Sequence, residues 1–343
     1  MKAAVLYKKR DLRIKEISLP VLKKGHALLK VLAVGVCGSD VHYFTRGRIG
    51  DQVITRPHIL GHEVSAEVVK VPRNRRGIRP GMRVAVEPGI SCGTCEHCRK
   101  GRPNICTKVR FLGTPPVSGA NREYLSYPVD CLFPLPKSMS PEEGALLEPL
   151  TIGWHSVELS KLQKGEDIAI LGFGPIGICT LKAALLRKPR RIFITELIPE
   201  RLRYAGKTFR NITVINAGRG DPVKTIQRMT KGRGVDVVYE CAGKQETIRQ
   251  SVEAAAVGGR VVWIGIPSGD FISIDPHIAR RKELVILFDR RARHAYPKCI
   301  KAVTQGKIVL KDMVTHVFKL KDIARAFSLV EHYKNGVIKA VIH

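Results

Sequence analysis

The chain has 343 residues and 44% apolar content, which suits a globular protein of two domains with a sizeable core. It has no run of 18 apolar residues, and its start alternates and is charged, which argues against a membrane span and a signal peptide and favours a cytoplasmic protein. The net charge of +29 indicates attraction of anions, but the basic runs are dispersed and lack interleaved aromatic side chains, which argues against nucleic acid as a partner.

Residues 1–150 read as short strands separated by turns rich in glycine and proline. Within them, the apolar run ILGHEVSAEVV at 59–69 contains His62 and Glu63, which are costly to bury without a partner. Neighbouring side chains of a strand point to opposite faces. The pair can therefore serve one site only if the chain bends at Gly61 or the site wraps around a turn. A surface histidine beside an edge glutamate is the plainer interpretation of such a pair alone.

Cys37, in GVCGSDVHYF, changes that interpretation. Together with His62 and Glu63 it offers a thiolate, an imidazole and a carboxylate, which balance the charge of a zinc ion and leave one coordination position open. An open position is typical of a catalytic zinc. The sequence therefore predicts a catalytic zinc site at these residues.

A second group of cysteines follows in SCGTCEHCRKGRPNIC, with the spacing C-x2-C-x2-C-x7-C. Its members are Cys92, Cys95, Cys98 and Cys106. Four thiolates at this spacing can close a tetrahedron around zinc and leave no position open, which predicts a structural site. An iron–sulfur cluster is the alternative. The polar loop and the lack of a following cysteine–proline pair favour zinc, and the scattered remaining cysteines indicate reduced thiols.

The pattern changes near residues 150–165. From Asp167 to about Asp289, apolar runs alternate with amphipathic helical stretches, which predicts a parallel sheet covered on both faces. The number of runs fits a doubly wound dinucleotide domain. We expect the mixed tail to return to the first domain. The predicted domains are 1–150, completed by 289–343, and 151–288.

The first apolar run leads into AILGFGPIG, a G-x-G-x-x-G pattern between a strand and a helix. Gly172 permits the tight turn, Gly174 lets the backbone approach a pyrophosphate, and Gly177 lets the helix pack on the strand. Glu196 ends the next strand, where a carboxylate accepts hydrogen bonds from ribose hydroxyls and repels a 2′-phosphate. This favours NAD over NADP, although the nearby Arg201 complicates the argument.

Together these motifs resemble the zinc-containing medium-chain dehydrogenase/reductase superfamily over essentially the full chain, and within it the sorbitol (polyol) dehydrogenases. The likeness is carried by CGSDVHYF, GRIG, GHE, EPG, EEGALLEPLTIGWHS, GFGPIG, YECAG and VTHVF. Threonine dehydrogenases look similar but usually have threonine in place of Ser39. The resemblance implies an α/β protein with a Rossmann coenzyme domain, a mostly-β GroES-like catalytic domain, and a homotetrameric assembly.

The resemblance also assigns residues to the site. It implies that Cys37, His62 and Glu63 hold the catalytic zinc, and that Glu148 approaches the metal directly or through water. The implied substrate pocket contains Ser39, Tyr43, Glu148 and Arg291. The implied NAD contacts are Ile176, Glu196, Arg201, Ile264, Gly265 and Ile266.

Two departures distinguish this chain from the animal sorbitol dehydrogenases. It keeps the four-cysteine lobe, and Arg290 and Ala292 replace aromatic side chains beside Arg291. The pocket is therefore expected to be more open and more cationic, which bears on whether sorbitol itself is the substrate.

The resulting hypothesis is reversible oxidation of a polyol to a ketose, with one catalytic and one structural zinc per subunit and NAD as hydride acceptor. The proton would leave through Ser39 and water, or by way of His42. A helix N-cap role for Ser39 and a structural role for His42 are equally compatible with the sequence. His155 is a further candidate for cofactor contact.

Two groups of alternatives stay open. The substrate could instead be L-threonine, glucose, an inositol, or a phosphorylated polyol attracted by the arginines. A basic zinc protein that binds nucleic acid on an enzyme scaffold is an alternative of another class. Only the net charge supports it, and the retained metal and nucleotide residues argue against it.

Overall fold

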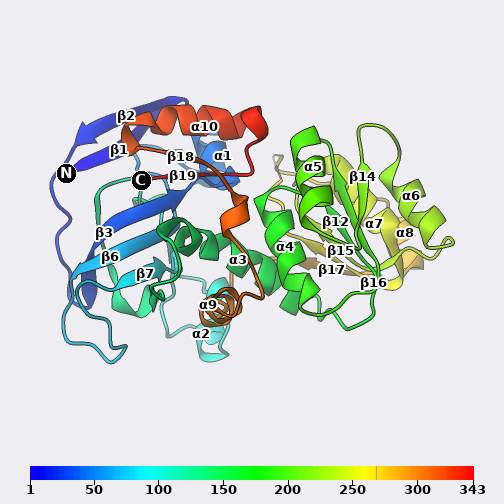
Figure 1. Cartoon of the computed structure of the whole chain (residues 1–343), viewed down its shortest axis with the longest axis horizontal. Helices are drawn as coiled ribbons and strands as arrows, with labels where there is room; N and C mark the ends of the chain where they lie inside the picture. Colours follow the sequence, from blue (N-terminus) through cyan, green and yellow to red (C-terminus); the bar gives the residue numbers. More distant parts are fainter. Residues whose placement is uncertain (268) are drawn as a thin grey trace. The chain divides into compact units, whose positions relative to one another are not determined.

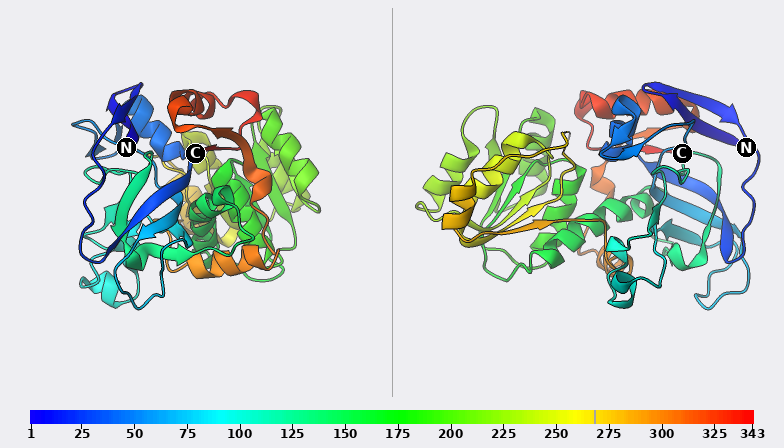
Figure 2. Two further views of the ribbon diagram at one scale, coloured as in Figure 1. Left: turned by 60° about the vertical axis from the view of Figure 1, so that its left-hand side comes forward. Right: turned by 180° about the vertical axis from the view of Figure 1, so that it is seen from behind.

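The computed structural model describes residues 1–267 and 269–343 and divides them into two compact units. The first unit consists of Met1–Glu148 and Arg293–His343, and the second of Pro149–Ala292. Both ends of the chain therefore lie in the first unit (Figure 2). Within the part of the chain that the structure describes, no helix is long and apolar enough to cross a membrane.

The first unit is built around a mostly antiparallel sheet with the strand order β11-β7-β6-β3-β19-β18, in which β10 also pairs with β3. Its strands are β3 (His26–Gly35), β6 (Glu63–Lys70), β7 (Arg83–Val86), β10 (Tyr124–Pro128), β11 (Leu132–Pro134), β18 (Val314–Phe318) and β19 (Lys339–Ile342). The last two come from the C-terminal segment, which joins the sheet where β19 pairs with β3. The predicted return of the tail to the N-terminal part is thus visible in the strand order.

Smaller elements surround this sheet. The strand pairs are β1 (Lys2–Lys8) with β2 (Asp11–Glu16), β4 (Arg48–Ile49) with β5 (Gln52–Val53), and β8 (Gly89–Ile90) with β9 (Arg110–Phe111). The α-helices are α1 (Gly38–Arg46), α2 (Glu96–Arg99), α9 (Tyr296–Thr304) and α10 (Ile323–Glu331), and α3 (Pro141–Leu159) carries the boundary between the units. The short 3-10 turns are Pro103–Ile105, Val129–Cys131, Lys311–Met313, Leu320–Asp322 and Lys334–Gly336.

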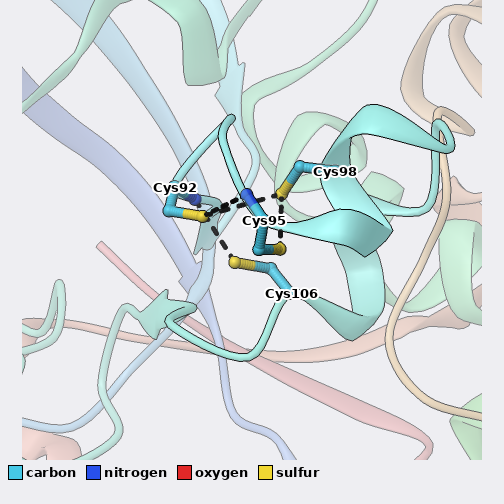
Figure 3. A group of neighbouring side chains, drawn as sticks. All are labelled: Cys92, Cys95, Cys98 and Cys106. Carbon is cyan, nitrogen blue, oxygen red and sulfur yellow. Dashed lines mark hydrogen bonds between the residues drawn. The ribbon is translucent and has the colours of Figure 1, made fainter.

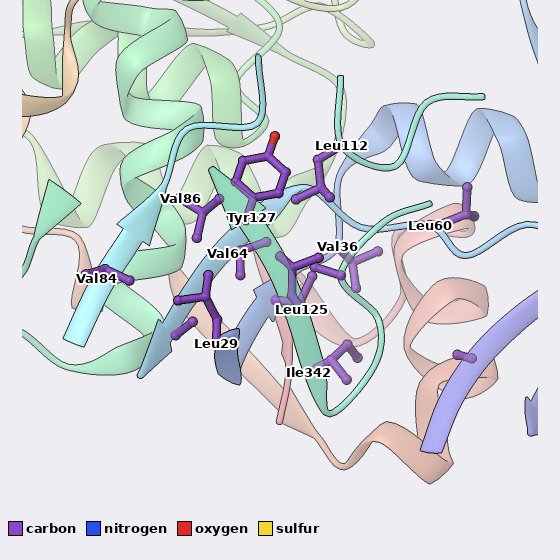
Figure 4. Packing of buried hydrophobic residues seen from close by; sticks show 14 of the residues in the cluster. Leu29, Val36, Leu60, Val64, Val84, Val86, Leu112, Leu125, Tyr127 and Ile342 are labelled. Carbon is purple, nitrogen blue, oxygen red and sulfur yellow. The ribbon is translucent and has the colours of Figure 1, made fainter. Parts of the chain in front are cut away.

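Figure 4 shows the core of the first unit, where side chains from neighbouring strands meet. The labelled residues are Leu29, Val36, Leu60, Val64, Val84, Val86, Leu112, Leu125, Tyr127 and Ile342. Alternate residues of each strand face this core, as the two-residue period of a strand requires. The hydroxyl of Tyr127 donates a hydrogen bond to the carbonyl oxygen of Pro88 at 2.6 Å, so this buried polar group is satisfied.

The second unit is a parallel sheet with the strand order β14-β13-β12-β15-β16-β17, which confirms the predicted doubly wound fold. Its strands are β12 (Ile168–Leu171), β13 (Ile192–Glu196), β14 (Thr213–Asn216), β15 (Val235–Glu240), β16 (Ala255–Trp263) and β17 (Val285–Phe288). Its helices are α4 (Pro175–Leu185), α5 (Pro199–Thr208), α6 (Pro222–Met229), α7 (Gln245–Ala254) and α8 (Pro276–Arg281).

Helices cover both faces of this sheet. Figure 1 shows α4 and α5 on one side and α6, α7 and α8 on the other. Every residue of β12 and β13 is buried as a result, which explains why these strands read as continuous apolar runs and not as alternating ones.

A charge cluster lies where β12 begins. The carboxylate of Asp167 is fully buried and accepts hydrogen bonds from Arg190 Nε at 3.0 Å and Nη2 at 2.8 Å, and from Arg191 Nη2 at 2.5 Å. Burial alone would raise the pKa of Asp167, but the two guanidinium groups lower it to about 2. The cluster therefore joins β12 to the loop that precedes β13.

We expect Asp167→Asn to destabilise the protein by about 1–3 kcal/mol at neutral pH, because it removes charge-assisted hydrogen bonds. The folded-state pKa is lowered, so this contribution is present above the unfolded value and is lost as the pH falls through the folded one. The stability gap between wild type and variant should thus close between about pH 4 and pH 2. Urea unfolding across this range measures it, with Asp51→Asn, an exposed carboxylate, as control. A gap independent of pH would contradict the assignment.

Candidate active site

The chain bends at Gly61, directly before His62 and Glu63. Gly61 has φ +99°, a conformation that favours glycine, and β6 begins only at Glu63. His62 therefore precedes the regular strand, and the alternation of strand side chains does not separate it from Glu63. Cys37 precedes α1, and the ligand atoms of these three residues all lie within 4.8 Å of one another.

This donor set fits a zinc ion. A thiolate, an imidazole and a carboxylate are ligands that zinc commonly takes, and both His62 and Glu63 are buried beside Cys37. The structure thus brings together the residues predicted to hold the catalytic metal.

Asp40 supports His62, a contact that sequence reasoning missed. Its buried carboxylate accepts hydrogen bonds from the backbone N–H of Cys37 at 3.3 Å and of Gly61 at 3.2 Å, and its Oδ1 lies 3.4 Å from His62 Nδ1. Burial lowers the pKa of His62, but the Asp40 carboxylate and Cys37 raise it well above its usual value. With Nδ1 held by Asp40, Nε2 is the nitrogen that can bind a metal.

The same contacts correct one prediction about α1. The helix is N-capped by Cys37, in a capping box with Asp40, so the interpretation of Ser39 as the N-cap is wrong. The sequence did contain a signal for this arrangement, because an acidic residue three positions after a cap is typical of a capping box.

Lys339 is the second residue that sequence reasoning missed. Its Nζ donates hydrogen bonds to both carboxylate oxygens of Glu63, at 2.7 and 2.8 Å, and to the carbonyl oxygen of Val36 at 3.1 Å. Both charged side chains are almost fully buried. A Cβ atom on Gly35 would lie 2.0 Å from Glu63 Oε2, so only glycine leaves room for the pair. Its only sign in the sequence is a lysine at the start of a short, otherwise apolar strand, which also suits a surface lysine.

Glu148 lies in α3 and is buried beside this group. Burial raises its pKa to about 7, with a further increase from Glu63 that the charges of His62 and Lys339 oppose. These electrostatic interactions place Glu148 near the candidate metal ligands, as the resemblance implies. It is not one of the three residues whose ligand atoms converge.

The remaining candidates of the substrate pocket and proton path are spread over both units. Ser39 and His42 are half-buried on α1. Tyr43 is buried there, and its hydroxyl donates a hydrogen bond to Gln52 Oε1 at 3.3 Å. Arg291 belongs to the second unit, where it is half-buried and has φ +59°.

The four clustered cysteines converge, as Figure 3 shows. Their sulfur atoms all lie within 4.8 Å of one another, with Cys92 and Cys98 4.0 Å apart and Cys95 and Cys98 3.5 Å apart. Sulfur atoms around a tetrahedral zinc lie about 3.8 Å apart. The backbone N–H of Cys95 points at Cys92 Sγ at 3.3 Å, and hydrogen bonds, first that of the Thr94 backbone, lower the pKa of Cys92 to about 5. The lobe therefore fits a closed metal site.

The glycine-rich turn lies between β12 and α4, as the sequence pattern predicts. Gly172 has φ +89°, and Gly174 is the N-cap of α4. A Cβ atom on Gly177 would lie 2.2 Å from the Gly172 carbonyl oxygen, so the helix can pack this closely only at glycine. A Cβ atom on Gly174 would lie 3.2 Å from Arg201 Nη1, which places this guanidinium beside the turn. Ile176 lies in the first turn of α4.

Glu196 is fixed at the end of β13. Its carboxylate accepts hydrogen bonds from the backbone N–H of Phe173 at 2.9 Å, Leu197 at 2.7 Å and Ile198 at 3.1 Å. Its Oε2 also lies 3.7 Å from Arg201 Nη1. The carboxylate is therefore held beside the glycine-rich turn. Ile264, Gly265 and Ile266 directly follow β16 at the same edge of the sheet.

His155 lies next to Asp289 in the second unit, with 3.8 Å between His155 Nε2 and Asp289 Oδ1. The hydroxyl of Ser156 also donates a hydrogen bond to Asp289. These contacts place His155 in a buried polar cluster, and no motif in the sequence indicated Asp289 as its partner.

Both parts of the chain match known protein families. Residues 23–137 match the alcohol dehydrogenase GroES-like domain, and residues 175–305 match the zinc-binding dehydrogenases. The chain is 38% identical over 343 residues to sorbitol dehydrogenase of Bacillus subtilis (strain 168), covering 100% of this chain and 97% of that protein. It is 36% identical over 325 residues to L-arabinitol 4-dehydrogenase of Hypocrea jecorina, covering 94% and 86%.

Solved structures are similar over the full length as well. An Escherichia coli oxidoreductase/dehydrogenase of unknown specificity has a TM-score of 0.93 at 34% identity, covering 99% of this chain and 98% of that one. A zinc-binding dehydrogenase of Sinorhizobium meliloti 1021, bound to NADP, has a TM-score of 0.88 at 30% identity, with the same coverage.

We expect Cys92→Ser to lower the zinc content of the purified protein from about two ions per chain to about one, because a closed four-thiolate site needs every ligand. Elemental analysis measures this, and the melting temperature should fall because metal binding stabilises the folded lobe. Cys131→Ser, a buried cysteine outside both groups, serves as control and should keep the wild-type metal content. Iron in place of zinc, or unchanged zinc in Cys92→Ser, would refute the structural zinc site.

Proposed function

The chain belongs to the zinc-dependent medium-chain dehydrogenase/reductase superfamily, close to its sorbitol dehydrogenases, and from this premise we propose that it is a polyol dehydrogenase. In the proposed reaction, a secondary alcohol of a polyol is oxidised to a ketose, and NAD receives the hydride. The convergence of the ligand atoms of Cys37, His62 and Glu63 is the observation that carries this proposal.

Cys37, His62 and Glu63 would hold the catalytic zinc. Bound there, zinc would supply Lewis-acid chemistry that lowers the pKa of a hydroxyl group next to it. The thiolate of Cys37 and the carboxylate of Glu63 would balance its charge, while Asp40 fixes the orientation of the His62 ring. Glu148 would complete the polar surroundings, as a direct or water-mediated neighbour of the metal.

The other polar groups of α1 would handle the proton and the substrate. Ser39 and His42 are half-buried on one helix, which supports a proton path from the alcohol through Ser39 to His42 and solvent. Tyr43 and Arg291 would contribute to binding the polyol hydroxyls. The second, structural zinc would be held by Cys92, Cys95, Cys98 and Cys106, which gives two zinc ions per subunit.

The two compact units support the assignment of separate functions to two domains. We assign the catalytic domain to residues 1–150 completed by 289–343, and the NAD domain to residues 151–288. In the NAD domain, the fixed Glu196 carboxylate favours NAD, since a 2′-phosphate would be repelled there. The remaining assigned NAD contacts are Gly172, Gly174, Ile176, Gly177, Arg201, Ile264, Gly265 and Ile266.

The assembly is proposed to be a homotetramer in the cytoplasm that acts on a small molecule and not on nucleic acid. The edge strand β17 supports self-association, because Val285 and Phe288 are 50% and 66% exposed at an edge that pairs only with β16 among the described strands. The five cysteines of the two candidate metal sites support a reducing compartment, because metal binding requires reduced cysteines.

A substrate panel tests the proposal. Zinc-loaded protein with NAD should oxidise sorbitol, xylitol or a related polyol faster than L-threonine, glucose, an inositol or a polyol phosphate, and His62→Ala should reduce turnover to near background because a zinc ligand is lost. His277→Ala, an exposed histidine on α8, is the control and should turn over like wild type. Full turnover in His62→Ala would exclude the zinc mechanism, and activity with phosphorylated substrates alone would exclude plain polyols.

Coenzyme choice gives a separate prediction. We expect Glu196→Ala to raise the KM for NAD by about 10-fold or more, because a charged group that bonds the ribose is worth about 1.5–3 kcal/mol. The preference for NAD over NADP should shrink at the same time. Initial rates with both coenzymes measure this, and Glu200→Ala, on the neighbouring α5, is the matched control. A wild-type preference for NADP would show that Arg201 and not Glu196 decides the choice.

A further inference from the structure

Glu240 is a buried carboxylate for which the proposed reaction gives no role. It ends β15 and is completely inaccessible to solvent. Its Oε1 accepts hydrogen bonds from the backbone N–H groups of Ala242 and Gly243, both at 2.8 Å, and from the Thr247 hydroxyl at 2.7 Å. One oxygen atom thus fixes the turn from β15 into the start of α7.

The backbone of Glu240 holds a second segment. Its carbonyl oxygen accepts hydrogen bonds from the N–H groups of Ile264 at 2.9 Å and Gly265 at 3.0 Å. We call residues 241–243 the β15 loop and residues 264–266 the β16 loop. Glu240 therefore binds the β15 loop through its side chain and the β16 loop through its main chain.

The two loops touch each other at glycines. A Cβ atom on Gly265 would lie 2.1 Å from the Gly243 nitrogen and 2.8 Å from Glu240 Oε2. Gly243 itself has φ +62°, and a Cβ atom on it would lie 2.4 Å from the Ile266 carbonyl oxygen. Backbone packs directly on backbone here, so a small shift of one loop displaces the other.

The second oxygen of the carboxylate is an anomaly. Glu240 Oε2 is buried and has no hydrogen-bond partner within residues 1–267 and 269–343. Burial raises the pKa of this carboxyl, and the hydrogen bonds from Thr247 and the loop amides oppose the increase. A buried oxygen without a partner is costly, and such groups in native proteins call for an explanation beyond packing.

The position of the two loops in the sheet indicates what Glu240 holds in place. In a doubly wound sheet the first half binds one mononucleotide and the second half binds the other, at the carboxyl ends of the strands. In this sheet β12, β13 and β14 form the first half, and β15, β16 and β17 form the second. The glycine-rich turn and Glu196 belong to the first half, and the β15 and β16 loops belong to the second.

We propose that Glu240 is a positioning residue that holds the β15 and β16 loops together, so that they form the binding surface for the nicotinamide half of the coenzyme. This inference rests on the proposed function, in which the second unit binds NAD. Glu240 itself touches neither coenzyme nor substrate. It acts through the amides of Ala242, Gly243, Ile264 and Gly265. Its loss should weaken binding of the nicotinamide end of the coenzyme and leave binding of the adenosine end unchanged.

Parallel binding of NADH and ADP-ribose tests this. Calorimetry on the zinc-loaded protein should give an NADH Kd about 10-fold or more higher in Glu240→Ala than in wild type, because buried amides lose their acceptor. The ADP-ribose Kd should change by less than about 3-fold, since that ligand lacks the nicotinamide ring and is bound through the first half. Glu240→Gln keeps an oxygen at the Oε1 position and should stay within about 3-fold of wild type for both ligands.

Two further variants keep the test decisive. Thr247→Val removes a single hydrogen bond to Oε1 and should weaken NADH binding by about 2–10-fold while ADP-ribose binding is kept, even if Glu240→Ala does not fold. Glu246→Ala removes an exposed carboxylate from the same helix and should leave both affinities unchanged.

The outcomes distinguish a failure of the positioning role from a failure of the coenzyme assignment. If wild-type protein binds both ligands, two results would overturn the positioning role alone. Either Glu240→Ala and Thr247→Val keep the wild-type affinity for both ligands, or they lose affinity equally for NADH and ADP-ribose. Wild-type protein that binds neither ligand overturns the coenzyme assignment, and this inference with it.

Discussion

The candidate active site depends on keeping several ionisable groups buried around one point. Asp40, His62, Glu63 and Lys339 are all almost inaccessible to solvent, and each has a partner of opposite charge or a hydrogen bond to the backbone. An unpaired charge there would cost several kcal/mol, so every neighbour must be compatible with the pairing. The absence of a side chain at Gly35 and the bend at Gly61 are consequences of this requirement.

Much of the fold could be predicted, because its signals are local. The parallel sheet is predicted by its continuous apolar runs, and the coenzyme site by the glycine pattern that ends in Gly177 and the carboxylate of Glu196. Each of these signals spans between a few residues and one β-α-β unit. The convergence of Cys37, His62 and Glu63 could be inferred from ligand chemistry, although the sequence could not show how the chain would bend. The structure supplies the answer in the conformation of Gly61 and the late start of β6.

The supporting residues could not be predicted, because their partners are distant or their signals are ambiguous. Lys339 is 276 positions from Glu63 and looks like a surface lysine in a short strand. Asp40 looks like a helix-capping residue, which it is, and its contact with His62 depends on where Gly61 turns. The sequence was compatible with Ser39 as the cap, and only the backbone shows that Cys37 holds that position. Glu240 gave no signal beyond its place in a motif.

The pairing of Glu63 with Lys339 also has a consequence for the order in which the protein is made. The candidate metal ligands are synthesised early, but β19 contributes its lysine only after the whole second unit. During translation Glu63 therefore lacks its counter-ion while the whole second unit leaves the ribosome. The buried ion pair of the first unit can therefore form only after the second unit has been synthesised, which ties completion of this part of the candidate site to synthesis of the C-terminal segment.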